Sequence, residues 1–331
     1  MRIAINGFGR IGRPTLRRIL ENHPNLEVVA INDLADKETL LFLLEHDSVY
    51  GKFQITNSKS QINSKIQNIK FLNEKDPENL PWKELGVDVV LECSGIFTKI
   101  EDAKKHLQAG AKKVIISAPS ESKEIPTYLL GVNEEKYDSK KDDIISMGSC
   151  TTNCLAPVVK ILHQNLGIEN GFMTTVHSYT NDQRILDLPH KDLRRARAAA
   201  INIIPTTTGA AKTVAKAIPE LEGKLDGISL RVPTPTVSIT DFVCTVKLPT
   251  PGVGKVNELF IEASRGKMKG ILAVSDEPLV SMDFKDNPHS SIVDLALTMV
   301  KDNLVKVVSW YDNEWGYACR LAEMVEFVTK N

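Results

Sequence analysis

Short apolar runs alternate with helical segments through the first half of the chain. The run Val28-Val29-Ala30-Ile31 has no polar interruption, which is typical of a parallel strand buried on both faces. This alternation predicts a doubly wound α/β domain with a parallel sheet. The expected strands are residues 2–6, 27–32, 87–92, 114–117 and 144–146, with helices over 10–22 and 100–109.

After residue 150 the apolar residues alternate over longer stretches, which predicts a second, α+β domain built on a mostly antiparallel sheet. The final stretch, residues 317–329, is apolar at helical spacing and predicts a C-terminal helix that packs back on the first domain. We therefore expect one domain over 1–148, completed by 313–331, and another over 149–312. The expected strands of the second domain are residues 171–178, 228–232, 239–248 and 305–310.

Two segments depart from these patterns. Residues 52–83 are rich in Lys, Asn, Ser and Gln, with short alternating stretches around Phe53 and Ile55 and from Ile66 to Phe71. We interpret them as a peripheral hairpin insertion, because the alternation argues against a disordered linker. Residues 179–204 are rich in Arg, Asp and Pro and have no strand period. A loop of that length is usually functional or forms an interface.

Composition and charge narrow the class of protein. The 331 residues are 42% hydrophobic and 25% charged, with a formal net charge of -1. No global positive charge attracts nucleic acid or an anionic membrane, so we expect neither as an obligatory partner. Five cysteines without paired CxxC clusters argue against a disulfide framework and a zinc site, and we expect no metal. No segment of 18 apolar residues and no signal-peptide pattern occurs, which favours a reducing, cytoplasmic setting.

A glycine-rich turn joins the first expected strand to the first helix: Gly7-Phe8-Gly9-Arg10-Ile11-Gly12. Such glycines let the backbone approach a pyrophosphate held by helix N–H groups. Asp33 ends the second strand, 21 residues after Gly12. A carboxylate there accepts the adenosine ribose hydroxyls and repels a 2′-phosphate, which favours NAD over NADP. The alternative is a tight turn in an α/β fold that binds no nucleotide. The motif predicts a Rossmann-type dinucleotide-binding domain.

Cys150 is the strongest candidate for chemistry. It lies where a strand-like run ends and a helical pattern begins, so a helix dipole would lower its thiol pKa and favour the thiolate. His177 ends a later strand-like run and is a candidate general base. The alternative is a buried structural thiol. The hydroxyls of Ser149, Thr151 and Thr152 argue against an inert core position.

Three segments of the second half suit anions. Residues 191–197 form a basic cluster, Thr206-Thr207-Thr208-Gly209 precedes an Ala-rich helix, and Arg231 lies at a strand end before Pro233. Hydroxyls and free N–H groups at a helix start bind anions, and arginines bind phosphate. Alone, the basic cluster is equally a solvated segment or an intersubunit contact. Together the three segments favour a phosphorylated substrate.

These motifs together resemble the phosphorylating glyceraldehyde-3-phosphate dehydrogenase family over essentially the whole chain. The Cys150 motif and the run Trp310-Tyr311-Asp312-Asn313-Glu314 are the most specific matches. The resemblance implies oxidation of D-glyceraldehyde 3-phosphate to 1,3-bisphosphoglycerate with NAD. Cys150 would form a hemithioacetal and then a thioester, His177 would accept the thiol proton, and inorganic phosphate would release the product. The family also implies a homotetramer, with the long loop along a neighbouring subunit's cofactor.

Residue by residue, the resemblance implies two phosphate sites and one cofactor site. The substrate phosphate would bind Thr180 and Arg231. Inorganic phosphate would bind Ser149, Thr151, Thr208 and Gly209, with Arg195 nearby. Besides the glycines Gly7 and Gly9, the cofactor contacts would be Arg10, Ile11, Asp33, Lys75, Ser117 and Asn313.

The chain departs from the family pattern at two points. Met147-Gly148 replaces the usual Asn-Ala before Ser149-Cys150, which changes a hydrogen bond near the nicotinamide side of the site. Lys75 replaces a common arginine near the adenine, and lysine stacks and forks less well. The nearest alternative activity is erythrose-4-phosphate dehydrogenase, whose thioester is hydrolysed by water, and the intact Thr206–Gly209 run argues against it. A secondary non-catalytic role in binding NAD, RNA or a surface is the alternative of another class.

Overall fold

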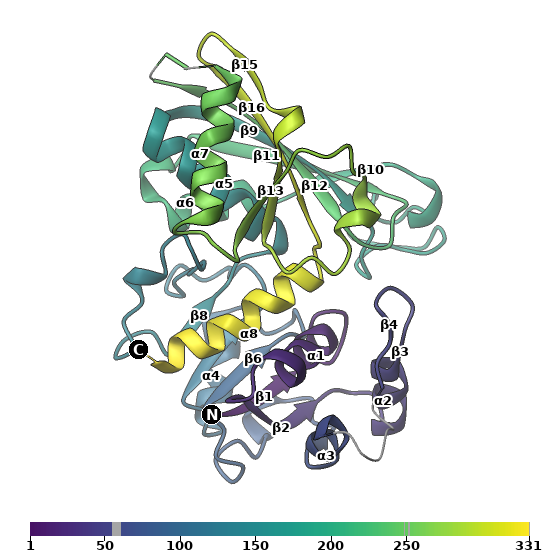
Figure 1. Cartoon of the computed structure of the whole chain (residues 1–331). Coiled ribbons are helices and arrows are strands. Elements are labelled where there is room, and N and C mark those ends of the chain that lie inside the picture. Colours follow the sequence, from purple (N-terminus) through teal and green to yellow (C-terminus); the bar gives the residue numbers. More distant parts are fainter. Residues whose placement is uncertain (55–60, 248, 251, 331) are drawn as a thin grey trace. The chain divides into compact units, whose positions relative to one another are not determined.

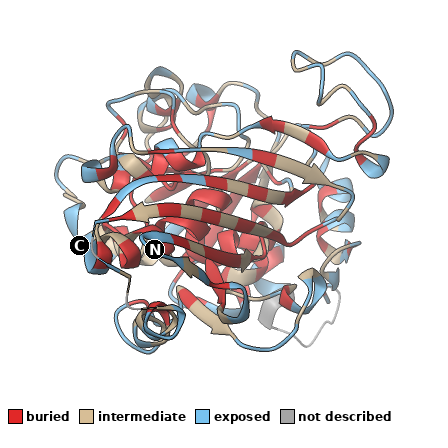
Figure 2. Ribbon diagram, turned by 90° about the horizontal axis from the view of Figure 1, so that it is seen from above, coloured by how far each residue is buried: buried red, intermediate tan, exposed pale blue. Residues whose placement is uncertain are grey.

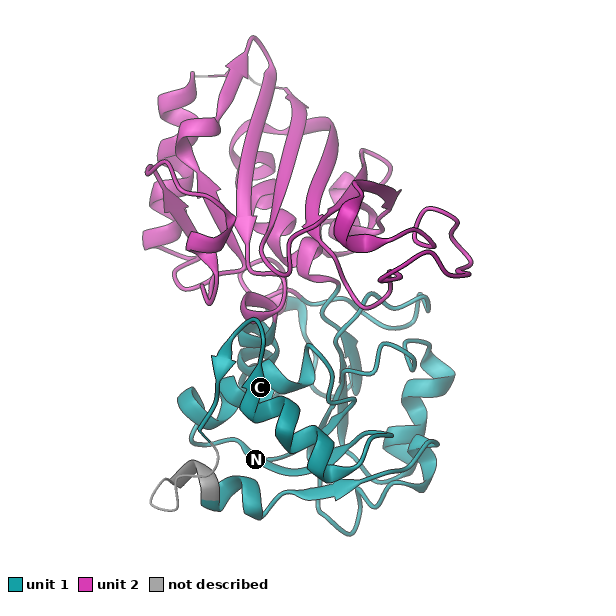
Figure 3. Ribbon diagram, turned by 90° about the vertical axis from the view of Figure 1, so that its right-hand side faces the viewer, with its two compact units in different colours: residues 1–128, 135–148, 318–331 teal, residues 129–134, 149–317 magenta. Residues whose placement is uncertain are grey.

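The computed structural model describes residues 1–54, 61–247, 249–250 and 252–330. The chain divides into two compact units, each with its own sheet (Figure 3). Unit 1 comprises residues 1–128, 135–148 and 318–331, and unit 2 comprises residues 129–134 and 149–317. The described part of the chain has no helix long and apolar enough to cross a membrane.

Unit 1 is built on a parallel sheet with the strand order β5-β2-β1-β6-β7-β8. Figure 1 labels β1, β2, β6 and β8 of this sheet. Its central strands are fully buried because helices and loops cover both faces, as the uninterrupted apolar runs predicted. The six strands are β1 (Arg2–Asn6), β2 (Glu27–Asn32), β5 (Lys70–Leu72), β6 (Val89–Glu92), β7 (Lys113–Ile116) and β8 (Ile144–Ser146). The other elements before residue 149 are α1 (Gly12–Asn22), α2 (Lys37–Glu45), β3 (His46–Asp47), β4 (Gly51–Lys52), α3 (Gln61–Gln67) and α4 (Ile100–Gln108).

Polar side chains end the three central strands of this sheet at their shared carboxyl edge. Glu92 is buried, and its Oε2 accepts hydrogen bonds from Asn6 Nδ2 at 2.6 Å and His106 Nε2 at 3.0 Å. Asn6 Oδ1 accepts from Asn32 Nδ2 at 2.7 Å. Trp82 Nε1 donates to His106 Nδ1 at 3.1 Å, so the ring proton of His106 lies on Nε2. This network ties β1, β2, β6 and α4 together because each buried polar group has a partner.

The expectation of a peripheral hairpin over residues 52–83 is wrong for the part that is described. β5 pairs in parallel with β2 inside the main sheet, and α3 precedes it. Ile66 and Ile69 are three residues apart and both buried, while Gln67 and Asn68 between them are exposed. A helix that exposes one face has a polar composition, which obscured its period. Residues 55–60, including Ile55, lie outside the described residues.

Unit 2 is built on a mixed sheet with the order β10-β11-β9-β12-β16-β14-β13, and β15 pairs with β16. The β9–β11 and β13–β14 pairs are parallel, and the other pairs described in this sheet are antiparallel. The strands are β9 (Ile168–Ser178), β10 (Ile204–Thr207), β11 (Leu225–Val232), β12 (Ser238–Val246), β13 (Leu272–Ser275), β14 (Ser291–Asp294), β15 (Met299–Lys301) and β16 (Leu304–Tyr311). Residue 248, where we expected β12 to end, lies outside the described residues.

One face of the unit 2 sheet is covered by α5 (Cys150–Leu166), α6 (Ala210–Ala217) and α7 (Val253–Arg265). Buried and partly exposed residues alternate along β12, the pattern of a strand with one buried face. Figure 2 shows this alternation of buried and intermediate residues along several neighbouring strands. Leu155, Val159 and Leu162 of α5 are fully buried in this core with Phe242 of β12. The core therefore fixes the axis of α5 against the sheet, and with it the position of the helix N-terminus.

The last helix, α8 (Trp315–Lys330), falls largely in unit 1. Its Glu326 accepts a hydrogen bond from His23 at the end of α1, with Nδ1 and Oε1 3.0 Å apart. Phe327 packs edge-on against Tyr137 with ring centroids 5.8 Å apart. The C-terminal segment therefore contributes side chains to the unit that the first 128 residues build.

The turn between β1 and α1 depends on a glycine for close packing. Gly7 has φ +91°, and a Cβ on it would lie 2.5 Å from the backbone nitrogen of Ser94. Gly51 in the same unit also has a positive φ, +72°, but a Cβ there would meet no atom within 4 Å. Substituting both glycines therefore distinguishes the cost of backbone strain, which both positions share, from the cost of steric overlap, which only Gly7 has.

We predict that Gly7→Ala lowers the free energy of unfolding by about 3 kcal/mol, because left-handed strain and overlap with Ser94 add. Gly51→Ala should cost about 1 kcal/mol, from strain alone. Urea unfolding of both variants measures the two losses. Equal losses would show that the approach of Gly7 to Ser94 does not limit stability.

Candidate active site

Cys150 is the first residue of α5, where the helix is capped by side chains. Ser149 Oγ accepts the Thr152 N–H at 3.0 Å, and Thr152 Oγ1 accepts the Ser149 N–H at 3.2 Å. This reciprocal capping box fixes the entry of the chain into the helix. It places the Cys150 sulfur at the positive end of a 17-residue helix.

The registers of neighbouring strands bring two further groups to Cys150. His177 lies near the end of β9, and Arg231 of β11 is its direct partner in the β9–β11 pairing. His177 Nε2 lies 3.5 Å from Cys150 Sγ, within hydrogen-bonding distance for sulfur. The structure therefore brings together the thiol and the imidazole that the sequence analysis selected.

The contacts of the His177 ring define its tautomer. Nδ1 lies 2.7 Å from the carbonyl oxygen of Ser178, which can only accept a hydrogen bond. This contact favours a proton on Nδ1, which leaves Nε2 free to accept the thiol proton of Cys150. Arg231 NH1 also lies against Nδ1, but a guanidinium can only donate, so in this tautomer its hydrogen bond goes to the same Ser178 carbonyl, at 3.3 Å.

The expected lowering of the Cys150 pKa is not what the surroundings produce. Burial raises the pKa of the thiol, while Arg231, the Thr151 hydroxyl and the N–H groups at the start of α5 lower it without cancelling the effect of burial. Burial and the adjacent Arg231 lower the pKa of His177 to about 3. The thiol and the imidazole are therefore both neutral before the reaction. Nε2 then carries no proton and can accept one.

Tyr311 is a residue of this centre that the sequence analysis did not select. Its buried hydroxyl lies 2.8 Å from Thr151 Oγ1 and 2.9 Å from Thr175 Oγ1, and its ring meets the His177 ring edge-on at 5.9 Å. In the sequence, Tyr311 stands out only as part of the family motif Trp310–Glu314. Its place at the end of β16, within a run that otherwise reads as core, gave no further signal. Its contacts occupy the Thr151 hydroxyl, one of the expected phosphate ligands.

The other expected phosphate ligands lie on the same unit. Thr208 Oγ1 accepts the Ala210 N–H at 3.2 Å, and Gly209 is the N-cap of α6. The Thr180 N–H donates to Gln183 Oε1 at 3.2 Å, two residues after β9 ends. Arg195 Nε donates to Thr206 Oγ1 at 2.8 Å, and Arg195 also pairs with Asp182.

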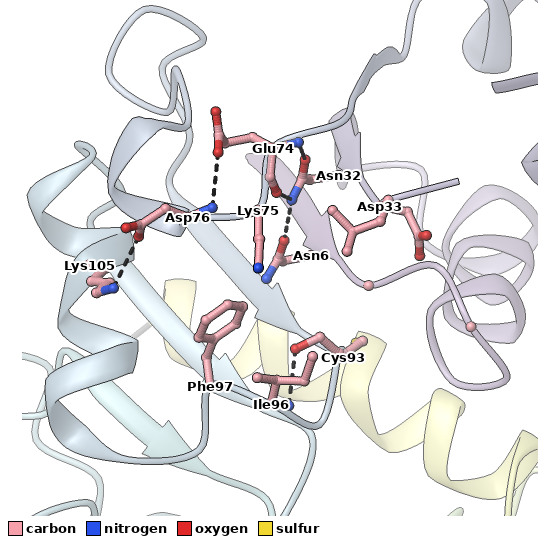
Figure 4. Close-up of a pocket in the computed structure, with 14 residues that line it drawn as sticks. Asn6, Asn32, Asp33, Glu74, Lys75, Asp76, Cys93, Ile96, Phe97 and Lys105 are labelled. Carbon is pink, nitrogen blue, oxygen red and sulfur yellow. Dashed lines mark hydrogen bonds and ion pairs between the residues drawn. The ribbon is translucent and has the colours of Figure 1, made fainter. Parts of the chain in front are cut away.

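A cavity of about 630 Å³ lies in unit 1 at the carboxyl edge of the parallel sheet (Figure 4). Gly7, Gly9, Asp33 and Lys75 all line it, with Cys93 on the β6 side. A Cβ on Gly9 would meet no protein atom within 4 Å, so protein packing does not require this glycine and a ligand can approach its backbone. The cavity fits the expected dinucleotide.

Asp33 is held at the wall of this cavity by backbone donors. Its Oδ2 accepts the Phe8 N–H at 2.8 Å, and its Oδ1 accepts the Ala35 N–H at 3.0 Å. Each oxygen has a further lone pair, so the carboxylate can still accept two ribose hydroxyls. This geometry suits an unphosphorylated ribose.

Three other expected cofactor contacts are placed differently. Arg10 turns to an ion pair with the buried Asp47 and lies over the Tyr50 ring, so its side chain supports the β3–β4 hairpin. Ile11 is the N-cap of α1 and Ser117 follows β7. Neither lines the cavity directly.

Asn313 belongs to unit 2. Its Oδ1 accepts hydrogen bonds from Ser178 Oγ and Ser238 Oγ, both at 2.9 Å. The two hydroxyls fix the amide orientation and leave Nδ2 as a donor.

The Met147-Gly148 pair joins β8 to the turn before α5. Met147 is fully buried, and Gly148 has φ +62°, where a side chain is disfavoured. The Gly148 N–H donates to Ser146 Oγ at 3.0 Å.

Among the described residues, no group of three or more His, Cys, Asp or Glu side chains could hold a metal ion. All five cysteines are free thiols.

Comparison with known proteins identifies the family of the chain. Residues 1–100 match the NAD binding domain of glyceraldehyde 3-phosphate dehydrogenase, and residues 149–313 match its C-terminal domain. The chain is 56% identical to a glyceraldehyde-3-phosphate dehydrogenase of Geobacillus stearothermophilus, covering 99% of this chain and 98% of the relative. It is 52% identical to glyceraldehyde-3-phosphate dehydrogenase 2 of Streptomyces avermitilis, covering 99% and 98%. It is also 52% identical to glyceraldehyde-3-phosphate dehydrogenase 1 of Bacillus subtilis, covering 100% and 98%. Both family models and the identity along nearly the full length lead to one conclusion: the chain belongs to the glyceraldehyde-3-phosphate dehydrogenase family of NAD-dependent enzymes.

Proposed function

We propose that the protein oxidises D-glyceraldehyde 3-phosphate to 1,3-bisphosphoglycerate, using NAD and inorganic phosphate, through a thioester on Cys150. The observation that carries this proposal is the 3.5 Å contact between Cys150 Sγ and His177 Nε2 at the N-terminus of α5. The relatives named above are glyceraldehyde-3-phosphate dehydrogenases, which supports the same substrate. The reaction would belong to glycolysis and gluconeogenesis.

In the first step, the Cys150 sulfur attacks the aldehyde carbon while Nε2 of His177 accepts the thiol proton. The new C–S bond leaves a negative charge on the former carbonyl oxygen. The N-terminus of α5 and the imidazolium stabilise that charge, and the imidazolium then protonates the oxygen to give the hemithioacetal.

In the second step, His177 takes the hydroxyl proton of the hemithioacetal back as the C–H bond breaks. When bound, NAD accepts the hydride. Cys150 is left holding the acyl group as a thioester, which keeps the oxidation energy available for transfer. The return of the same proton explains why a single base serves both steps.

Anion sites on unit 2 would hold the two phosphates. Arg231 and Thr180 would bind the phosphate of the substrate, since Arg231 lies beside His177 in the β9–β11 register. Inorganic phosphate would bind Ser149, Thr208, Gly209 and Arg195 before attacking the thioester. The new P–O–C bond forms as the C–S bond breaks, and the Cys150 sulfur takes back the proton that His177 holds. Because Tyr311 engages the Thr151 hydroxyl, Thr151 would contribute its backbone N–H or exchange partners.

The cofactor would be held mainly by the cavity of unit 1. Gly7 and Gly9 admit the pyrophosphate to the start of α1, and Asp33 binds the adenosine ribose. Lys75 would lie by the adenine, with Arg10, Ile11 and Ser117 supplying backbone or supporting contacts. Asn313 would bind the nicotinamide carboxamide through Nδ2. We propose that unit 1 is the dinucleotide-binding domain and unit 2 the catalytic domain. The units differ from the expected division into 1–148 with 313–331 and 149–312, because residues 129–134 and 313–317 fall in unit 2.

We also propose that the chain forms a homotetramer in the cytoplasm. The loop after β9 exposes apolar side chains that water disfavours, and Leu193 is 81% exposed. A second copy of the chain would cover them and bring the loop to its cofactor. The exposed apolar residues of the loop are Ile185, Leu186, Leu188, Leu193, Ile201 and Ile203.

We predict that turnover requires inorganic phosphate or arsenate, because water does not replace the bound anion at the thioester. NADH formation from glyceraldehyde 3-phosphate should exceed that from erythrose 4-phosphate at least tenfold. Spectrophotometric assays with each aldehyde, with and without phosphate, measure both effects. Equal turnover without either anion, or a preference for erythrose 4-phosphate, would favour a hydrolysing erythrose-4-phosphate dehydrogenase.

Cys150→Ser should lose at least 10³-fold in kcat while binding NAD with unchanged affinity, because the hydroxyl is a far weaker nucleophile than the thiol. Isothermal titration with NAD provides the binding control. His177→Asn should lower kcat about 10²- to 10⁴-fold through loss of the base. Retained dehydrogenase activity in Cys150→Ser would show that the thiol mechanism is wrong. Absence of turnover in the wild-type protein, with NAD still bound, would favour a non-catalytic NAD-binding role.

We predict a native mass about four times the 36.7 kDa of one chain. Leu193→Glu should lower that mass, because a charge at a covered apolar position opposes association. Val253→Glu on α7 is the matched control and should leave the mass unchanged. Light scattering during size-exclusion chromatography measures each mass. A tetramer that persists in Leu193→Glu would exclude Leu193 from the interface.

A further inference from the structure

Arg195 has two kinds of partner in the long loop of unit 2. On one edge, Nε donates to Thr206 Oγ1 at 2.8 Å and lies 3.4 Å from Asp192 Oδ2, which also accepts the Thr206 hydroxyl at 3.1 Å. NH2 faces the Thr207 carbonyl at 3.5 Å. Thr206 is buried, so these contacts anchor the guanidinium to β10.

The other edge of the same guanidinium is covered by a carboxylate. Arg195 NH1 donates to Asp182 Oδ2, and the other Asp182 oxygen lies 3.4 Å from His190 Nε2. The Asp182 side chain is 46% exposed, whereas that of Arg195 is only 20% exposed. An anion that arrives from solvent therefore meets the accessible Asp182 carboxylate, which already accepts a hydrogen bond from Arg195 NH1.

The Arg195–Asp182 pair lies within electrostatic range of the reacting centre. Burial lowers the pKa of Arg231, and the nearby Cys150 and Tyr311 raise it. Two smaller effects come from the pair itself: Arg195 lowers the pKa of Arg231, and Asp182 raises it. Arg231 in turn contacts His177. The pair therefore belongs to the same charged cluster as the thiol, on the side where we place inorganic phosphate.

We propose that Asp182 is an internal counter-ion that occupies the outer edge of Arg195 until inorganic phosphate displaces it. Asp182 thereby sets the phosphate concentration at which the thioester is released. The inference rests on the proposed function of the site. It assigns to Asp182, which does not itself bind phosphate, control of the enzyme's affinity for phosphate.

The competing account is that Asp182 orients Arg195 for phosphate. Thr206 and the Thr207 carbonyl already hold Nε and NH2, so the plane of the guanidinium is defined without Asp182. A carboxylate on the remaining NH1 blocks the bidentate approach by which arginine binds phosphate. The two accounts predict opposite changes in phosphate affinity.

Asp182→Asn should lower the phosphate KM about two- to fivefold with kcat unchanged at saturating phosphate, because a partly exposed ion pair is weak enough to exchange. Asp182→Glu restores the charge and should return the KM toward the wild-type value. Thr206→Val removes an anchor of Arg195 without changing its charge, so it should raise the phosphate KM. Asp187→Asn removes a charge from the same loop, where Asp187 pairs with Arg197, and should leave the KM unchanged.

Each variant is assayed in the full-length enzyme by varying phosphate at saturating aldehyde and NAD. The NADH burst without phosphate is recorded as the readout of the acylation step. An unchanged or raised phosphate KM in Asp182→Asn, with a normal burst, would overturn the counter-ion role. An equal decrease in Asp187→Asn would overturn it too, since net charge alone would then explain the effect. Absence of any burst or phosphate dependence in the wild-type protein would instead reject the proposed function itself.

Discussion

The contact between Cys150 Sγ and His177 Nε2 is the interaction on which the proposed chemistry depends. Two independent features of unit 2 place its atoms. The packing of α5 on the sheet and the Ser149–Thr152 capping box position the sulfur. The parallel register of β9 and β11 positions the imidazole and puts Arg231 beside it. A shift of one residue in that register would turn His177 to the other face of the sheet and remove the base.

The charges around this pair explain why a base and anion sites occur together. Burial opposes the charge of both the thiolate and the imidazolium, and Arg231 further disfavours the imidazolium. The resting pair is therefore neutral, and charge develops only when the sulfur bonds to a carbonyl carbon. A phosphorylated substrate at Arg231 would neutralise the guanidinium that disfavours a protonated His177. In this account, the substrate anion favours the protonation state that the first step produces.

The sequence predicted much of the fold because its signals were local. Uninterrupted apolar runs identified β1 and β2 to the residue, and Cys150, His177 and the Gly7–Gly12 turn were selected from motif and position. The α3–β5 segment was misread because a solvent-facing helix is polar at nearly every position. The pKa of Cys150 and the contacts of Tyr311 and Asp182 depend on burial and on residues distant in sequence, so no local pattern reveals them.

The most direct test of the central claim is the intact mass of the protein after mixing with NAD and glyceraldehyde 3-phosphate in phosphate-free buffer. The account predicts a mass increase equal to one 3-phosphoglyceroyl group per chain, located on Cys150 by peptide mapping and removed within seconds by added phosphate. An unmodified mass during NADH formation, or an acyl group on any other residue, would contradict the assignment of Cys150 as the atom that carries the substrate between oxidation and phosphorylation.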